Sequence, residues 1–319
     1  MKYKLTHNTI TTVDGVVLHR IQALRDFGDV KEGDLGGWIE KERNLSQEGK
    51  CWVADQSQVF GEAVVYDEAY VYGNAKVSGD ALVYNNAQVC GNAHIYGNAQ
   101  VSNNAKVSGD GWVYGNARVC DSSRVWGEGD VYGKAVVSDS SRVYGDATIY
   151  GNARVGGNAM VSGNAALIGE AHVFQNARVG GNARLSDNAI IFGDAWVYGD
   201  ARVSGYASVF GNARVYGNAC VCGYAQIYGN AQIYSRSRVK SGEWNETPLQ
   251  IQGSKHYLNM VTPEILRIAC EEHTIPEWLK NYRIIAAKHD IRNENTIEEY
   301  LGHIKKFAEK YCPEALKGA

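Results

Sequence analysis

Residues 75–80 read Ala75-Lys76-Val77-Ser78-Gly79-Asp80, and close copies of this hexad fill most of the chain. An aliphatic residue recurs at every sixth position from Val53 to Val239, and all 32 of these positions hold Val, Ile or Leu. Self-similarity at a fixed short period is the mark of a repeat architecture, in which each unit buries its apolar residues against the next. The hexad therefore predicts a repeat fold.

One short strand and one corner explain the hexad. Side chains alternate across a strand, so Ala75 and Val77 share one face while Lys76 and Ser78 share the other. The apolar pair must face a core. Gly79-Asp80 then makes the bend, because glycine and the short Asn or Asp residues tolerate tight turns. We therefore expect an all-β solenoid with flat sides and equal corners.

This pattern resembles the left-handed parallel β-helix of hexapeptide-repeat proteins. The resemblance implies three hexads in each coil, hence 18 residues per turn, and a triangular cross-section. On that basis residues 51–240 would form about 11 coils, and strands stacked ~4.8 Å apart would make a prism roughly 50 Å tall. The handedness comes from the resemblance alone, because a period of six does not specify it.

The first residues, 1–50, do not repeat, and we expect them to form an N-terminal β cap over the unpaired strands at the end of the solenoid. Residues 11–17 predict two strands around an Asp14-Gly15 turn. Several motifs near this end resemble the start of an uncharacterised β-helix family of the YdcK type, which carries a provisional transferase label. They are Asp26–Val30, Gly36-Gly37-Trp38, Asn44–Gln47 and Cys51-Trp52.

Residues 241–319 lose the period and predict a small C-terminal α/β domain. Its expected elements are a hairpin over 249–261, a third strand over 265–270, a helix opened by Thr274 and Pro276, and a second helix with a capping box at Thr296 and Glu299. This tail resembles the tails of β-helix proteins from phage and prophage genomes. It could cap the solenoid or dock a partner, and we favour the cap.

The overall composition excludes several classes of partner. The net charge of −3 and the isoelectric point near 6.3 argue against a nucleic-acid partner such as DNA. No apolar run approaches the ~20 residues that cross a membrane, and the first residues lack the apolar core of a secretory signal. The seven cysteines are odd in number and scattered, so we expect reduced thiols in a cytoplasmic protein.

The repeat offers little catalytic or metal-binding chemistry. Hexapeptide-repeat acyltransferases, which it resembles, carry a catalytic histidine and a protruding loop, but these hexads run from 53 to 239 without an insertion. His94 and His172 occupy outward positions, and we interpret both as solvated surface residues. Cys220 and Cys222 also point outward, but basic residues on the neighbouring coils would repel a metal ion. We therefore predict neither a cofactor nor a metal site.

Residues 18 apart should stack on successive coils, and one face then gathers basic and aromatic side chains. Guanidinium groups on that face could bind a phosphate or carboxylate, with the rings against any planar part of the ligand. The candidate residues are Lys106, Arg124, Arg142 and Arg178, the aromatic Trp126 and Tyr144, and the corner residues Asp121, Ser122, Asp139 and Ser140. The competing interpretation, which we favour, is that these basic residues form a solvated column that keeps the protein soluble. The Asp and Ser residues at the corner would then reflect neutral sequence drift.

Two further columns are aromatic. They are Tyr96, Tyr114, Tyr132 and Tyr150 on one face and Phe174, Phe192, Phe210 and Tyr228 on another. A monomer seldom leaves such a stripe open to water, so we expect these rings to form an oligomer interface. Left-handed β-helices often assemble side by side as trimers, and we therefore favour a homotrimer.

Two function classes remain open. The first, which we favour, is a non-catalytic oligomeric scaffold that binds or sequesters a small anionic ligand, such as a nucleotide in a phage or bacterial setting. The second is an acyltransferase-like transferase with its active site between protomers, where a histidine of one chain would lie near a cleft with the next. The uninterrupted repeat and the missing loop favour the first class.

Overall fold

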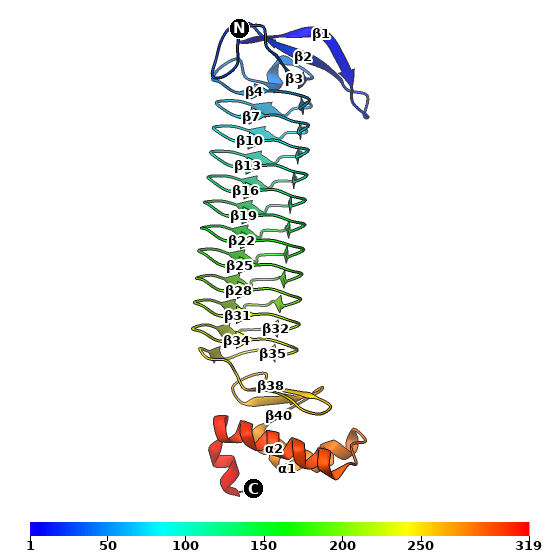
Figure 1. Cartoon of the computed structure of the whole chain (residues 1–319), viewed down its shortest axis with the longest axis vertical. Helices are drawn as coiled ribbons and strands as arrows, with labels where there is room; N and C mark the ends of the chain where they lie inside the picture. Colours follow the sequence, from blue (N-terminus) through cyan, green and yellow to red (C-terminus); the bar gives the residue numbers. More distant parts are fainter. Residues whose placement is uncertain (319) are drawn as a thin grey trace. The chain divides into compact units, whose positions relative to one another are not determined.

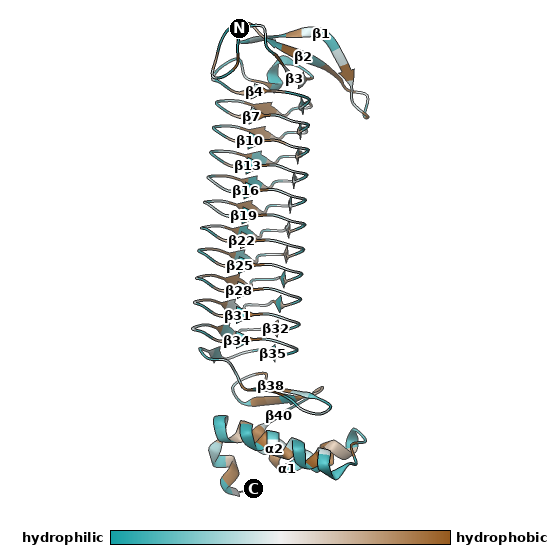
Figure 2. Cartoon of the chain, in the orientation of Figure 1, coloured by the Kyte–Doolittle hydropathy of each residue, from teal (hydrophilic) through white to brown (hydrophobic). Residues whose placement is uncertain are grey.

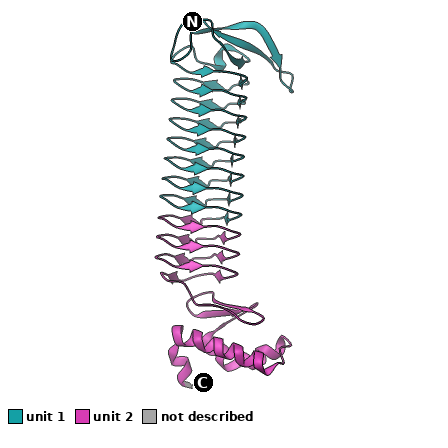
Figure 3. Ribbon diagram, in the orientation of Figure 1, with its two compact units in different colours: residues 1–187 teal, residues 188–319 magenta. Residues whose placement is uncertain are grey.

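The computed structural model describes residues 1–318 (Figure 1). The chain divides into two compact units, residues 1–187 and residues 188–319 (Figure 3). In each unit the hexads form short strands that pair in parallel, so the expected β-solenoid is confirmed. Each unit is described in turn, and the expected domain boundaries after residues 50 and 240 stay predictions.

Unit 1 starts with an antiparallel hairpin. β1 (Tyr3–Thr11) pairs with β2 (Val17–Ala23), and the turn between them contains Asp14-Gly15. β3 (Leu35–Ile39) pairs antiparallel with β2 and parallel with β5 (Gln58–Val59), so the hairpin sheet continues directly into the solenoid. Parallel pairing therefore begins at β3, upstream of the first expected coil. A short 3-10 turn, η1 (Glu42–Asn44), follows β3.

The coils of unit 1 carry their strands on three faces. Face 1 contains β5, β8 (Lys76–Val77), β11 (His94–Ile95), β14 (Trp112–Val113), β17 (Asp130–Val131), β20 (Thr148–Ile149), β23 (Ala166–Leu167) and β26 (Arg184–Leu185). Face 2 contains β4 (Trp52–Val53), β7 (Tyr70–Val71), β10 (Gln88–Val89), β13 (Lys106–Val107), β16 (Arg124–Val125), β19 (Arg142–Val143), β22 (Met160–Val161) and β25 (Arg178–Val179). Face 3 contains β6 (Val64–Val65), β9 (Leu82–Val83), β12 (Gln100–Val101), β15 (Arg118–Val119), β18 (Val136–Val137), β21 (Arg154–Val155) and β24 (His172–Val173).

Strands 18 residues apart lie next to one another. Lys106 is the partner of Arg124, and Arg124 is the partner of Arg142. The backbone N–H of Arg124 donates to the carbonyl of Ser141 at 2.9 Å, so each coil is hydrogen-bonded to the next. This register confirms the expected 18 residues per turn and places outward side chains in straight columns.

The inward residues of the hexads fill the core. Val77 and Ala75 are fully buried, as are the corresponding residues of the other coils, and Figure 2 shows hydrophobic residues recurring on successive strands. Serine replaces the inward alanine at Ser123 and Ser141, where it is also fully buried. The Ser123 hydroxyl donates to the Cys120 carbonyl at 2.6 Å, which satisfies this buried polar group.

Corners of the coils need a left-handed backbone. Gly79 has φ +67°, and a Cβ at this position would lie 2.8 Å from the backbone nitrogen of Gly97 on the next coil. The stacked corners are therefore too close for most side chains, which explains why glycine recurs there.

The first part of unit 2 has the same pattern of parallel strand pairs, and its last part has a different structure. Its solenoid strands are β27 (Ile190–Ile191), β28 (Trp196–Val197), β29 (Arg202–Val203), β30 (Ser208–Val209), β31 (Arg214–Val215), β32 (Cys220–Val221), β33 (Gln226–Ile227), β34 (Gln232–Ile233), β35 (Arg238–Val239) and β36 (Glu243–Trp244). An antiparallel sheet and two helices follow: β37 (Gln250–Gln252), β38 (Tyr257–Met260), β39 (Ile265–Ile268), β40 (Glu271–Thr274), α1 (Ile275–Lys288), α2 (Glu294–Tyr311) and the 3-10 turn η2 (Pro313–Gly318).

The C-terminal predictions were correct for the hairpin, the third strand and the first helix. Thr274 caps α1, because its hydroxyl accepts from the N–H of Glu277 and the Glu277 carboxylate accepts from the N–H of Thr274. The capping box expected at Thr296 and Glu299 was wrong. α2 begins three residues earlier than that box implies, because the side chain of Asn293 caps it by accepting from the N–H of Thr296.

Candidate functional site

An open hollow of about 630 Å³ lies on face 3 of unit 1. We call it the basic groove, and its residues are Asn116, Arg118, Lys134, Val136, Asn152, Arg154, Glu170 and His172. It brings three cationic side chains, one carboxylate and one imidazole together on four successive coils. The groove was not among the sites predicted from the sequence.

The solenoid register builds the groove. Arg118, Val136, Arg154 and His172 are outward residues of β15, β18, β21 and β24, and each is the partner of the next in parallel pairing. Val136 is much shorter than the two arginines beside it, so it leaves a depression between them. Since neighbouring strands are ~4.8 Å apart, the two arginines emerge ~10 Å apart and can reach one anion from opposite sides.

A second column at the adjacent corner completes the groove. Lys134 and Glu170 stand two residues before Val136 and His172, and both are exposed. Lys134 adds a third cation beside the arginines. Glu170 places a carboxylate beside the imidazole, where the sequence had indicated no acidic partner.

His172 is half-buried in this groove, not fully solvated as expected. Burial lowers the pKa of the His172 imidazole, and the positive charge of Arg154 lowers that pKa further, while Glu170 opposes the change. The lowered pKa favours the neutral form of the ring, and a neutral imidazole can accept a proton. The groove therefore combines a base with anion-binding side chains.

His94 occupies a different site, on face 1. A cleft of about 390 Å³ lies between the turn of the β1–β2 hairpin and the outward side chains of β5, β8 and β11. The hairpin extends sideways beyond the coils near it (Figure 1). The His94 ring stacks on Trp112 with centroids 5.0 Å apart, and burial and then Lys76 lower its pKa. His94 is thus also half-buried, beneath a segment that overhangs the face.

The basic column predicted on face 2 is in register but is not continuous. Arg124 and Arg142 are exposed neighbours, and Met160 separates them from the exposed Arg178. Lys106 is half-buried, and its ammonium group donates to the hydroxyl of Tyr72 at 3.3 Å. Lys106 therefore points toward an earlier coil, whereas Arg124 and Arg142 remain available to solvent.

The rings predicted beside this column stack on each other. Trp126 and Tyr144 have centroids 4.7 Å apart and planes within 7°. One face of each ring is therefore covered by the other ring. A planar ligand on this column would have to use an outer face of the pair.

The corner residues predicted with this column have a structural role. Asp121 and Asp139 take the left-handed conformation with φ of 61° and 58°, where other corners have glycine. The Asp121 carboxylate accepts from the N–H of Asp139 at 3.2 Å, and Asp139 accepts from the N–H of Gly157 at 2.7 Å. The first of these bonds is the main reason why the pKa of Asp121 is lowered. Ser122 and Ser140 are exposed beside them.

The aromatic columns stack as the 18-residue register predicts. Tyr96, Tyr114, Tyr132 and Tyr150 follow one another with centroids 4.8, 4.7 and 5.0 Å apart, and Phe192, Phe210 and Tyr228 do so in unit 2 at 4.7 and 5.1 Å. These rings and Phe174 are half-buried. More exposed aromatic residues lie at a corner of unit 2, where Tyr206 and Tyr224 are 58% and 71% exposed.

All seven cysteines have free thiols. Within residues 1–318 no group of three or more His, Cys, Asp or Glu side chains is placed to hold a metal ion. In the same part of the chain, no helix combines the length and the apolar character needed to cross a membrane.

Comparison with known proteins identifies the type of repeat in parts of this chain. The family model described as YdcK Beta solenoid repeat matches residues 75–91, 87–103, 141–157, 153–167 and 183–199. The chain carries YdcK-type β-solenoid repeats. A stretch of 65 residues is 43% identical to the protein of Escherichia coli K12 named "Uncharacterized acetyltransferase YdcK", and it covers 20% of each chain. The match therefore spans about a fifth of that relative's length. The YdcK-type repeats confirm the resemblance expected from the sequence.

The hexads also contain the signal that could have revealed the basic groove. When the hexads are written in rows of 18, Arg118, Arg154 and His172 fall in one column, and Lys134 and Glu170 fall in the column two places before it. The neighbours of His172 along the chain do not reveal this site, because most of its partners lie on the adjacent coils.

Proposed function

We propose that this chain is an acyltransferase whose active site is the basic groove. The observation that carries this proposal is the presence of half-buried His172, with a lowered pKa, in the same hollow as Arg118, Lys134 and Arg154. The relative from E. coli is named an acetyltransferase, which supports acyl transfer as the reaction. The groove thus favours acyl transfer, the reaction of the second function class, over the non-catalytic scaffold, but it places the active site within one chain and not between protomers.

The donor in this proposal is an acyl thioester that carries phosphate groups. Arg118 and Arg154 flank the short Val136 and can hold a phosphate between them, with Lys134 beside the same hollow. Guanidinium groups bind phosphate oxygens through two parallel hydrogen bonds, and this fixes both the position and the orientation of the donor.

His172 acts as the general base. It takes the proton from an acceptor hydroxyl or amine as the acceptor oxygen or nitrogen bonds to the thioester carbonyl carbon. The carbon–sulfur bond then breaks, and the leaving thiolate receives the proton that His172 took. Burial and then the charge of Arg154 lower the pKa of His172, so both favour the neutral imidazole before the reaction.

The test measures thiol release from acetyl-CoA by the full chain in the presence of a panel of amine and hydroxyl acceptors. We expect His172→Gln to lower kcat by ~10²-fold or more, as is usual when a general base is lost. Arg118→Gln with Arg154→Gln should mainly raise the KM for acetyl-CoA. Arg124→Gln with Arg142→Gln makes the same charge change on face 2 and serves as the matched control. Absence of transfer to every acceptor, or full activity of His172→Gln, would reject the proposal.

A second candidate function is the binding of a small anion on face 2 without catalysis. It is favoured by the exposed, registered pair of Arg124 and Arg142 beside the stacked Trp126 and Tyr144. A nucleotide suits both features, since its phosphates would pair with the arginines and its base with an outer ring face. Calorimetry with nucleotides, sugar phosphates and acetyl-CoA tests this function. Equal affinity of the wild type and the Arg124→Ala/Arg142→Ala variant would exclude face 2.

A further inference from the structure

A cavity of about 220 Å³ lies in the C-terminal part of unit 2, between the antiparallel sheet and the helices α1 and α2. Apolar side chains from each of these elements line it, among them Ile268, Trp278, Ile285, Ala286, Ile297 and Ile304. The cavity belongs entirely to unit 2. It has no connection with the chemistry proposed for the basic groove.

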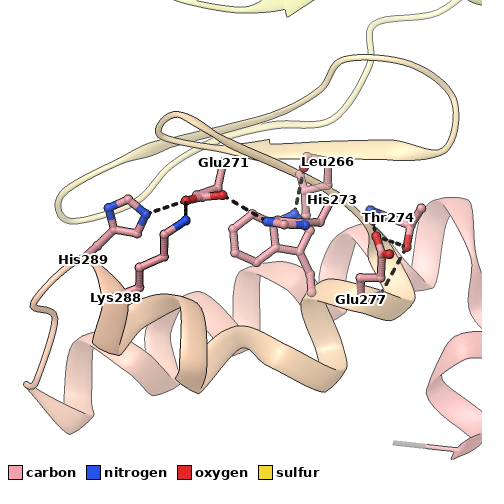
Figure 4. A network of polar contacts seen from close by, with 8 residues as sticks. Leu266, Glu271, His273, Thr274, Glu277, Lys288 and His289 are labelled. Carbon is pink, nitrogen blue, oxygen red and sulfur yellow. Dashed lines mark hydrogen bonds and ion pairs between the residues drawn. The ribbon is translucent and has the colours of Figure 1, made fainter.

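Polar groups at the edge of this cavity already have partners within the chain. The Glu271 carboxylate accepts from the ammonium group of Lys288 at 2.8 Å and contacts the rings of His289 and His273 at 2.8 and 3.2 Å (Figure 4). The Tyr300 hydroxyl accepts from the N–H of Lys255 at 3.0 Å. The charges of this edge therefore compensate one another and leave no net charge to attract an ionic ligand.

Apolar residues are also accessible along the cavity wall. Ile285, Ala286 and Ile291 line the cavity and remain half-buried, although the helices beside them are otherwise packed against the sheet. His256, Tyr282 and Tyr300 also line the cavity, but most of its wall is apolar, and apolar walls lack van der Waals partners until a ligand fills the space. Cavities of ~150 Å³ in other proteins bind benzene, so this larger one has room for a substituted or bicyclic ring.

We infer that this cavity is a binding site for a small neutral apolar molecule, with a single aromatic or bicyclic ring as the best fit. Three features support this ligand class: the volume, the isoleucine and tryptophan lining, and the compensated charges at the edge. A charged ligand would have to leave water without gaining an unpaired partner here.

Indole and toluene are suitable probes, because both are neutral and fit the volume. Saturable shifts of the Trp278 indole N–H signal in NMR spectra of the full chain, together with a rise in melting temperature, are expected on addition of either probe. Benzoate tests the charge argument, and it should bind at least tenfold more weakly than toluene. Equal binding of benzoate would overturn the assignment to neutral ligands.

Two adjacent alanines of α1 give a matched pair of variants. Ala286→Phe places a ring in the cavity and should weaken probe binding at least tenfold, whereas Ala287→Phe adds the same ring at an exposed position and should leave binding unchanged. If Ala286→Phe does not fold, Ile304→Ala replaces it, and the enlarged cavity should then bind naphthalene more tightly than the wild type does. Unchanged binding in the variant that folds, or the absence of saturable binding to wild type, would overturn the inference. The inference would also be overturned if a second copy of the chain filled the cavity of the wild type. Probe binding would then weaken as the protein concentration rises.

Discussion

Arg154 and His172 are direct partners in the parallel strands β21 and β24, one coil apart on face 3. Their positive and titratable groups therefore emerge side by side, and the charge of Arg154 lowers the pKa of His172 in addition to the effect of burial. The relationship depends only on register, because the two residues are 18 positions apart in the sequence.

The first prediction concerns this pair. Arg154→Gln should raise the pKa of His172, because it removes a positive charge that disfavours the imidazolium ion. If His172 is the general base, the rising limb of the pH–rate profile should move to higher pH by the same amount. Titration of the His172 ring by NMR, with and without the substitution, measures the pKa directly. Arg124→Gln, which is on another face, should leave it unchanged, and an unchanged pKa in Arg154→Gln would contradict the electrostatic explanation.

The second prediction concerns the core. Val143 is fully buried, so Val143→Asp places an unpaired carboxylate in the packed interior, at a cost of several kcal/mol. We expect this variant to lose cooperative thermal unfolding in circular dichroism. Arg142→Asp introduces the same carboxylate one residue earlier, at an exposed position, and should remain folded. A soluble Val143→Asp protein with a cooperative transition would show that the inward register is wrong.

The third prediction is the oligomeric state. Stripes of half-buried rings, such as Tyr114 and Tyr132 in unit 1 and Phe210 in unit 2, gain further burial if a second chain packs along them. We expect a homotrimer at micromolar concentration, measured by light scattering. The double variant Tyr114→Ser/Tyr132→Ser should weaken the association of the chains. A wild-type mass of 34.9 kDa, that of one chain, would remove the prediction.

The fourth prediction is an acid dependence of the C-terminal part. The hydrogen bond from Lys288, followed by those from His289 and His273, lowers the pKa of Glu271 to about 2 from an ordinary value of 4.5. The stabilising contribution of this carboxylate is therefore complete above pH 4.5 and is lost as the pH falls through about 2. Glu271→Gln should lower the melting temperature at neutral pH, and the difference from wild type should vanish towards pH 2. A difference that does not change with pH would mean that the ion pairs do not contribute.

Much of the solenoid could be predicted because a single local rule is repeated. The spacing of Val77 and its equivalents sets both the inward register and the stacking of residues 18 apart, and the ring separations of the Tyr96 column confirm it. The strand β40 escaped prediction because its sequence, Glu271–Thr274, is polar, and only pairing with β39 makes it a strand. The start of α2 was misplaced because Asn293 and Thr296 are both good capping residues, and local sequence does not choose between them.

The basic groove was harder to predict than the columns that compose it. Arg118 and His172 are 54 positions apart, and their relation requires both the coil length and the depression at Val136. The apolar cavity of unit 2 could not be predicted at all, because it depends on how α1 and α2 pack against an antiparallel sheet. Packing of this kind leaves no periodic signal in the sequence.

The 18-residue register has a consequence for how such a chain can change by duplication or loss of sequence. Loss of three consecutive hexads, residues 125–142, would shorten the solenoid by one coil and leave every later residue on its original face. Loss of a single hexad would turn all later residues by one face, so that the His172 column would move from face 3 to face 1, while each buried valine would still meet a buried neighbour. The packing of the core would thus survive the loss of one hexad, although this loss would change which outward side chains lie next to one another. Deletion or duplication of one hexad can therefore bring distant side chains together on a new surface in a chain that keeps its core.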